Sequence, residues 1–151
     1  MINLYDTTLE VLNIFNRNYT EKGIDIKIQL PIDTIVYSDT VILKIILRNL
    51  ISNAIKFTLK GGEINIFVEQ FSQKQITIIV KDTGIGMEQE LIDNLFLIEM
   101  DTNRNGTDGE ISNGLGLVIT KEFVEMLGSV LIIESQINQG STFKFTVLKA
   151  E

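Results

Sequence analysis

Residues 81–87 read Lys81-Asp82-Thr83-Gly84-Ile85-Gly86-Met87, a carboxylate followed by two glycines that are two residues apart. The run before them, Ile76 to Val80, is apolar and mostly β-branched, which is typical of a buried strand. Glycine accepts positive φ and lets another group come close to the backbone. The stretch therefore predicts a buried strand that ends in a carboxylate and a tight glycine turn.

A carboxylate held at the end of a strand can accept a hydrogen bond from an exocyclic amine, such as that of adenine. An Asp-x-Gly-x-Gly run is also a common turn with no binding role. Both interpretations stay open on these residues alone, and the flanking segments decide between them.

The composition describes one domain, residues 1–151, in which 44% of the residues are hydrophobic, enough for a sizeable core. The chain has no cysteine, so neither a disulfide nor a thiolate metal site is available within it. It has no histidine either, which excludes imidazole catalysis, imidazole metal ligands and phosphohistidine within these residues.

No apolar run reaches membrane-spanning length, and no signal peptide is visible at the start. We expect a cytoplasmic domain that does not itself contact the membrane, although a longer parent protein could be anchored in one. The net charge is −7, from 20 acidic and 13 basic residues, so we expect no direct nucleic-acid binding. An acidic domain that binds an anionic nucleotide needs backbone N–H groups, a cation or a few placed lysines.

The clearest helix is predicted from Thr40 to about Thr58. Asn49, Asn53 and Lys56 lie at i, i+4 and i+7 in it and share one face. Asparagine is a mediocre helix former, so two on one face beside apolar neighbours require an explanation. Either the amides are solvated or bonded to backbone, or the row faces a ligand, with an amide oxygen for a metal and an ammonium for phosphate.

The remaining elements follow from their periodicity, and Ser38 or Asp39 is the expected N-cap of the long helix. Further helices are predicted at 4–19, 88–96 and 118–127, and strands at 24–30, 35–37, 63–69, 76–82, 130–134 and 142–148. Helices interrupt an antiparallel sheet rather than alternating with every strand. This order predicts an α+β fold, a two-layer α/β sandwich with a mixed, mostly antiparallel sheet and helices on one face.

A polar stretch without periodicity runs from Met100 to Asn113. Such long loops are uncommon in compact domains and often act as lids, although a surface insertion has the same composition. The run Gly114-Leu115-Gly116-Leu117 then opens a helix. Glycines at a helix start leave N–H groups bare for a phosphate, and the alternative is a flexible entry to the helix.

The asparagine row, the Asp-x-Gly-x-Gly run and the glycines at the last helix follow one another in the order that is typical of sensor histidine kinases, and the resemblance covers nearly the whole chain. Residues 49–58 (NLISNAIKFT) resemble the family's N box, and residues 82–87 (DTGIGM) its first glycine box. Leu95-Phe96 stands where the phenylalanine box lies, and residues 114–117 (GLGL) resemble the second glycine box. Residues 140–143 (GSTF) resemble the small glycine/threonine element near the family's C-terminus. The resemblance implies the family's catalytic, ATP-binding domain, an α/β sandwich called the Bergerat or GHKL fold.

The resemblance also implies roles for individual residues. Asn53 would coordinate Mg²⁺ through its amide oxygen, Asn49 would support the phosphates or the metal's waters, and Lys56 would contact the phosphate chain. Asp82 would accept from the adenine amine of ATP, directly and through water. Gly84 and Gly86 would shape the adenine pocket, and Gly114, Leu115 and Gly116 would present backbone N–H groups to the phosphates. The remaining nucleotide-binding residues would be Phe57, Met87 and Leu117. The loop from about 97 to 113 would be the ATP lid.

Two positions depart from the family's pattern. Ser112 and Asn113 stand where the second glycine box usually has another glycine and a threonine. Serine has less backbone freedom than glycine, so the geometry of the lid or its phosphate contact is expected to differ. Ser129 follows Gly128 where two glycines are common, and we expect little effect there.

The position four residues before Asn53 distinguishes this chain from chaperone, topoisomerase and mismatch-repair ATPases with the same fold. Those relatives typically have a glutamate there that activates water. This chain has Asn49, whose amide cannot accept that proton at neutral pH. Hydrolysis by this route is disfavoured, and transfer to a partner side chain is favoured.

The resemblance implies that the γ-phosphate goes to a histidine on a separate dimerisation domain, which normally precedes this one, and then to the receiver domain of a response regulator. Because the chain has no histidine, we expect it to bind ATP without autophosphorylation. A second hypothesis is a non-catalytic regulatory module, in which ATP orders the lid and changes a docking surface. A third is a structural domain without nucleotide affinity.

Overall fold

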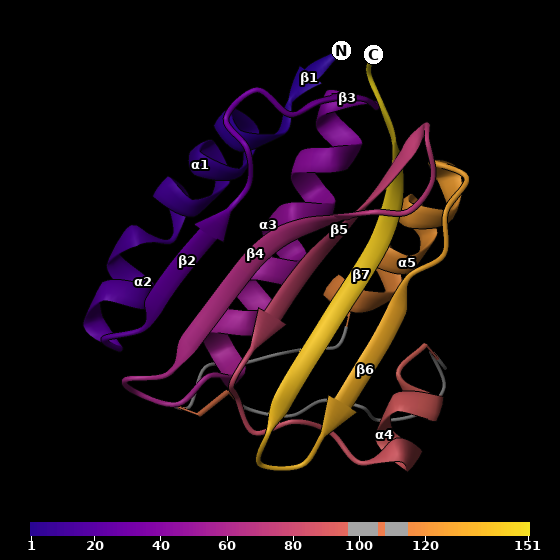
Figure 1. The fold of residues 1–151 in the computed structure, drawn as a ribbon. Coiled ribbons are helices and arrows are strands. Elements are labelled where there is room, and N and C mark those ends of the chain that lie inside the picture. The colour runs from indigo at the N-terminus through magenta and orange to yellow at the C-terminus, as the bar shows by residue number, and fades with distance from the viewer. Residues whose placement is uncertain (97–105, 108–114) are drawn as a thin grey trace.

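The computed structural model describes residues 1–96, 106–107 and 115–151 of the chain (Figure 1). The helices are α1 (Leu4–Ile14), α2 (Asn16–Glu21), α3 (Thr40–Phe57), α4 (Gln89–Asn94) and α5 (Leu115–Met126). The strands are β1 (Ile2–Asn3), β2 (Asp25–Gln29), β3 (Ile35–Tyr37), β4 (Glu63–Gln70), β5 (Gln75–Asp82), β6 (Ile132–Gln136) and β7 (Gly140–Lys149). None of the helices in these described ranges combines the length and hydropathy that crossing a membrane requires.

One seven-stranded sheet runs in the order β1-β3-β7-β5-β4-β2, and β6 pairs with β7 beside it. The long strands β4, β5 and β7 form its centre, where β5 is antiparallel to both neighbours. Among the strand pairs of the described residues, only β2 with β4 is parallel. This confirms the predicted mixed, mostly antiparallel sheet.

The helices α1, α3 and α5 lie together behind the sheet in Figure 1, which confirms the two-layer α+β sandwich. Side chains alternate along β5, so Ile76, Ile78 and Val80 are buried on the helix side. The central helix α3 contributes a stripe of fully buried side chains, Leu43, Ile46, Leu47, Leu50 and Ile51. Burying one such side chain contributes roughly 1.5–3 kcal/mol, so α3 is fixed firmly against the sheet.

The structure differs from the sequence prediction in several details. The helix predicted at 4–19 is two helices, because Phe15 leaves helical geometry at φ −101° and ψ 7° and donates its N–H to the Leu12 carbonyl. The edge strand β1 has two residues, too few to show a period, and was not predicted. Helix α5 begins at Leu115 rather than at 118. Of the two expected N-caps of α3, the structure has Asp39, whose carboxylate accepts from the N–H of Ile42 at 3.0 Å.

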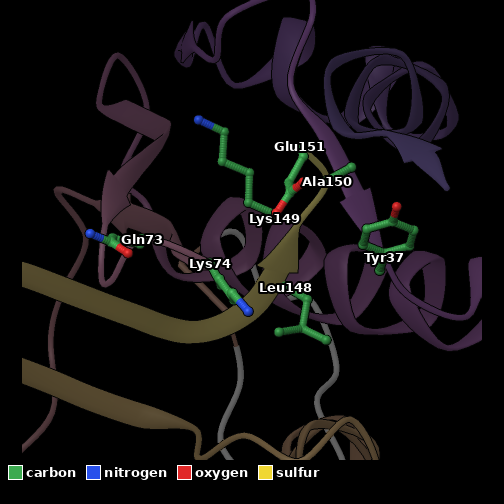
Figure 2. A pocket seen from close by; sticks show the side chains of 7 residues that line it. All are labelled: Tyr37, Gln73, Lys74, Leu148, Lys149, Ala150 and Glu151. Carbon is green, nitrogen blue, oxygen red and sulfur yellow. The ribbon is translucent and has the colours of Figure 1, made fainter.

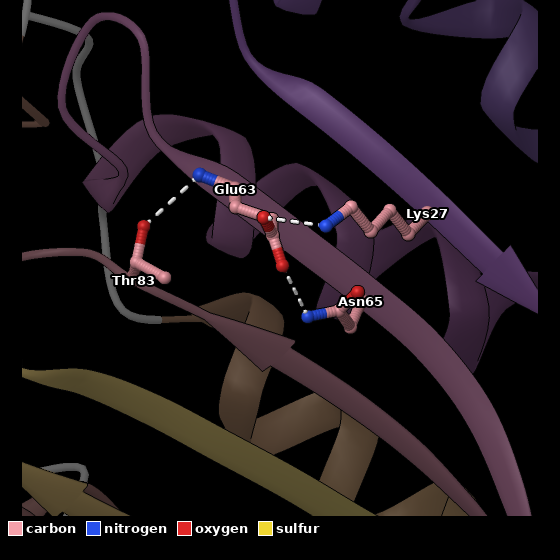
Figure 3. A network of polar contacts seen from close by, with 4 residues as sticks. All are labelled: Lys27, Glu63, Asn65 and Thr83. Carbon is pink, nitrogen blue, oxygen red and sulfur yellow. Dashed lines mark hydrogen bonds and ion pairs between the residues drawn. The ribbon is translucent and has the colours of Figure 1, made fainter.

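A polar network on the outer face of the sheet joins β2, β4 and the end of β5 (Figure 3). The Glu63 carboxylate accepts from Lys27 Nζ at 3.0 Å and from the Asn65 amide at 2.8 Å, while the Glu63 N–H donates to Thr83 Oγ1 at 3.0 Å. The hydrogen bond from Lys27, followed by that from Asn65, lowers the pKa of Glu63. The Glu63 carboxylate therefore joins the parallel strands β2 and β4 beside the glycine turn.

Candidate functional site

Asp82 ends β5 as a buried carboxylate on the helix side of the sheet, where it continues the alternation of Ile78 and Val80. Only 3% of the residue is exposed. Its Oδ1 accepts from the N–H of Gly84 at 2.8 Å and from the N–H of Ser141, on β7, at 3.3 Å. A buried carboxylate requires such partners, and these two bonds fix its orientation.

The glycine turn that follows Asp82 lies against the C-terminal end of α3. The N–H of Ile85 donates to the Phe57 carbonyl at 3.0 Å. A Cβ on Gly84 would lie 2.2 Å from that same carbonyl oxygen, far inside any real contact. Only glycine lets the turn come this close to the helix, so the predicted glycine turn has a packing cause.

A second contact holds the turn against the β6–β7 connection. Gly86 has φ +67°, and a Cβ there would lie 2.0 Å from the Gln136 carbonyl oxygen. Gly140 has φ +116°, and a Cβ there would lie 2.0 Å from the backbone oxygen of Asp82. The N–H of Asn138 donates to the Ile85 carbonyl at 2.8 Å. Three glycines therefore allow α3, β5 and the β6–β7 turn to meet at one end of the sheet.

Gly86→Ala is expected to destabilise the domain more than Gly128→Ala. Both glycines have positive φ, +67° and +76°, which costs an alanine about 1–2 kcal/mol. A Cβ added at Gly128 would have nothing within 4 Å, whereas at Gly86 the backbone of Gln136 must also move. We expect a total loss of about 3 kcal/mol or more for Gly86→Ala.

Thermal unfolding followed by circular dichroism measures this difference, since each kcal/mol lowers Tm by roughly 2–4 °C in a domain of this size. Gly128→Ala is the matched control for backbone strain. Equal losses of Tm in the two variants would show that the close approach at Gly86 carries no energetic weight.

Two serines for which the sequence predicted no individual role complete this end of the sheet. The N–H of Met87 donates to Ser135 Oγ at 2.8 Å, and Ser135 Oγ lies 2.7 Å from Ser141 Oγ. Ser141 stands opposite Asp82 in the β5–β7 register. The resemblance of residues 140–143 to a family element was a signal for Ser141, but nothing local in the sequence marks Ser135.

The first residue of the polar row on α3, Asn49, contacts α5. The Asn49 side-chain amide donates to the Gly116 carbonyl at 3.3 Å, in the first turn of α5. Asn53 lies one turn further along the same face of α3 and is half-buried, as is Lys56 in the last turn. For Asn49, this contact agrees with the first of the two explanations of the row, in which the amides are solvated or bonded to backbone. The role of Asn49 toward phosphate stays a prediction.

The other predicted binding residues lie on both sides of this region. Phe57 and Met87 are buried beside the glycine turn. Leu115 is exposed at the first position of α5, and Leu117 is buried. Gly114 and most of the predicted lid lie outside the described residues, apart from Gly106 and Thr107. Asp82 and the helix that carries Asn53 lie on the same side of the sheet, as a shared cleft requires.

A hollow of about 450 Å³ lies at the opposite end of the sheet (Figure 2). Its lining residues are Tyr37, Gln73, Lys74, Leu148, Lys149, Ala150 and Glu151. Gln75 pairs with Leu148 at that end of β5, whereas Asp82 pairs with Ser141 at the other. The seven residue steps between them span roughly 23 Å, so this hollow is separate from the region around Asp82.

The α+β sandwich, with a buried strand-end carboxylate, glycine turns and a helix-borne amide row, defines the class of Bergerat-type ATP-binding domains. Residues 38–151 match the family described as histidine kinase-, DNA gyrase B-, and HSP90-like ATPase, and the chain belongs to this family.

Two relatives, one of them in two solved structures, show where in the family the chain lies. The autoinducer 2 sensor kinase/phosphatase LuxQ of Vibrio vulnificus is 36% identical over 151 residues, which cover 96% of this chain and 18% of LuxQ. The catalytic domain of histidine kinase ThkA superposes with a TM-score of 0.80 at 26% identity, over 98% of this chain and 94% of that one. ThkA in complex with response regulator protein TrrA gives a TM-score of 0.77 at 25% identity, over 99% of this chain and 41% of that one. The chain therefore corresponds to the catalytic, ATP-binding domain of sensor histidine kinases and spans about a fifth of its curated relative LuxQ.

Proposed function

We propose that the chain binds Mg-ATP and transfers the γ-phosphate to a histidine on a separate dimerisation domain, for relay to the receiver domain of a response regulator. The observation that carries the proposal is the buried Asp82 carboxylate, oriented by two backbone N–H groups on the side of the sheet where α3 carries Asn53 and Lys56. The likeness to LuxQ and to the ThkA catalytic domain supports the kinase assignment. We assign the domain to the cytoplasm as part of the same proposal.

At the adenine end, Asp82 would accept a hydrogen bond from the exocyclic amine. The glycine turn supports this role because its N–H bond to Oδ1 holds the carboxylate still before the ligand arrives. Gly84 and Gly86 keep the backbone close to α3 and to the β6–β7 turn, which shapes the space beside the base. Phe57 and Met87 supply buried apolar surface next to it.

At the phosphate end, Lys56 would contact the phosphate chain, and the first N–H groups of α5, at Leu115, Gly116 and Leu117, would point to it. Asn53 fits a Mg²⁺ ligand, because it offers a half-buried neutral oxygen and Mg²⁺ is usually held by one or two protein groups together with substrate phosphates and water. The bound cation would neutralise charge on the phosphates of a nucleotide held by a domain of net charge −7.

Asn49 supports transfer over hydrolysis. Its amide donates to the Gly116 carbonyl, and an amide cannot remove a proton from water at neutral pH. In the proposed reaction, an imidazole nitrogen of the partner histidine attacks the γ-phosphorus, the bond to the β,γ-bridging oxygen breaks, and ADP leaves. The chain's own residues bind and orient the nucleotide for this in-line step.

The test is reconstitution with a histidine-bearing dimerisation domain, such as that of a LuxQ-like kinase, and ATP labelled at the γ-phosphate. We expect label on the partner that is lost in acid and retained in base, as phosphohistidine requires, and none when the acceptor histidine is replaced by alanine. A parallel titration with Mg-ATP separates the alternatives. Binding without transfer to any paired domain would contradict the kinase and favour the non-catalytic nucleotide-binding module, whereas no binding would favour the structural domain.

A further inference from the structure

Lys22 is a buried cation at the C-terminal end of α3. Only 5% of the residue is exposed. Its Nζ donates to the carbonyl oxygens of Ile55 at 2.8 Å and Lys56 at 3.1 Å, and to Thr107 Oγ1 at 2.7 Å. Among the described residues, these three oxygens accept from the ammonium, and a buried charge requires hydrogen-bond partners of this kind.

Lys22 completes the hydrogen bonding of the last turn of α3. The final carbonyls of a helix have no partner inside it, and a cation near them also interacts favourably with the helix dipole. Here the carbonyls of four successive residues, Ala54, Ile55, Lys56 and Phe57, accept in order from Thr58, Lys22, Lys22 and Ile85. The end of α3 is therefore held jointly by Lys22 and by the glycine turn.

The backbone of Lys22 is itself fixed. Its N–H donates to the Asn18 carbonyl of α2 at 3.3 Å, and its carbonyl accepts from the N–H of Gly61, in the turn after α3, at 2.9 Å. Because the backbone of Lys22 is held in place, the fold defines where its ammonium meets α3.

The contact between Lys22 and Thr107 goes beyond what capping the helix requires. It lies 85 residues from Lys22 in the sequence, in the connection between α4 and α5. Its N–H donates to the Lys56 carbonyl at 2.8 Å, and its hydroxyl lies 2.9 Å from the Thr58 carbonyl. Lys22 therefore joins Thr107 to the helical turn that carries Lys56.

We propose that Lys22 is a positioning residue for the phosphate side of the nucleotide site: its ammonium holds Thr107 against the last turn of α3 and thereby sets the position of Lys56. The proposal rests on the proposed function, in which Lys56 contacts the phosphate chain. Because the Lys22 ammonium is bonded to protein acceptors, it acts through Lys56 and not on the nucleotide.

The first test is Lys22→Met in the 151-residue chain. The variant is titrated with Mg-ATP and with adenosine at a temperature well below the Tm of the variant. We expect the affinity for Mg-ATP to fall by about tenfold and that for adenosine by less than about twofold, because adenosine lacks the phosphates. Lys81→Met is the matched control, since it removes the same charge from an exposed lysine on the outer face of β5.

Thr107→Val and Thr107→Ser give a second test, which decides the matter if Lys22→Met does not fold. Valine removes the hydroxyl that Lys22 binds, and we expect it to weaken Mg-ATP but not adenosine, whereas serine keeps the hydroxyl and should restore Mg-ATP affinity. A lower Tm with unchanged Mg-ATP affinity, or equal losses for both ligands, would overturn the positioning role while leaving the proposed function intact. Failure of the unaltered chain to bind Mg-ATP would overturn both.

Discussion

Asp82→Asn is expected to weaken Mg-ATP binding by about 10- to 100-fold, because a hydrogen bond to a charged group contributes roughly 1.5–3 kcal/mol. The amide has the same shape as the carboxylate, so its oxygen can still accept from the N–H groups of Gly84 and Ser141. Its NH₂ group then replaces the other carboxylate oxygen, and a donor faces the adenine amine where an acceptor is needed. The fold should persist while the recognition of the base is lost.

The same substitution is expected to change which purine the domain prefers. Guanine presents a carbonyl acceptor at the position of the adenine amine, so an amide donor at residue 82 suits it better than a carboxylate does. Titrations with Mg-ATP and Mg-GTP should therefore show the ATP-to-GTP affinity ratio falling by about tenfold or more.

Asp33→Asn, at an exposed loop carboxylate, is the control and should change neither affinity. An Asp82→Asn variant with wild-type affinity for ATP and a wild-type Tm would show that the base does not contact this carboxylate, and the proposed site would then be wrong.

The sequence predicted best the elements that are long enough to show several repeats of a helical or strand period. Helix α3 and strands β4 and β5 each run for eight residues or more, so a period of 3.6 or 2 is readable in them. The break between α1 and α2 depends on the backbone angles of one residue, Phe15, and periodicity averages such a residue away. The parallel pairing of β2 with β4 depends on which distant strands meet, and no local pattern carries that information.

Some residues of the candidate site were likewise visible in the sequence, and others were not. Asp82 and the glycines after it are adjacent in the chain, so their motif is visible in the sequence, and the asparagine row is visible because one helix face spaces it. Lys22 followed by Gly23 is typical of an ordinary helix end with a solvated lysine. Its partners lie 33 and 85 residues away, so only the folded chain reveals that this lysine is buried.

Asn53→Ala is expected to reduce phosphoryl transfer by about 100-fold or more while weakening Mg-ATP binding only a few-fold, since removing one group that stabilises developing charge typically costs 10²–10³ in rate. The proposed Mg²⁺ ligand matters most when charge is redistributed over the phosphates, and the adenine contacts at Asp82 still hold the ground state. Transfer to the histidine-bearing domain gives the rate, and titration with ATP gives the affinity.

A readout independent of transfer is the dependence of ATP affinity on Mg²⁺. The unaltered chain should bind ATP more tightly with Mg²⁺ than with a chelator, and Asn53→Ala should lose most of that difference because the cation loses its protein oxygen. Asn13→Ala, at an exposed asparagine of α1, controls for replacing asparagine in a helix, where alanine is the better helix former. If Asn53→Ala kept both the transfer rate and the full effect of Mg²⁺, the metal would have to be held elsewhere, and the assignment of Asn53 as its ligand would be wrong.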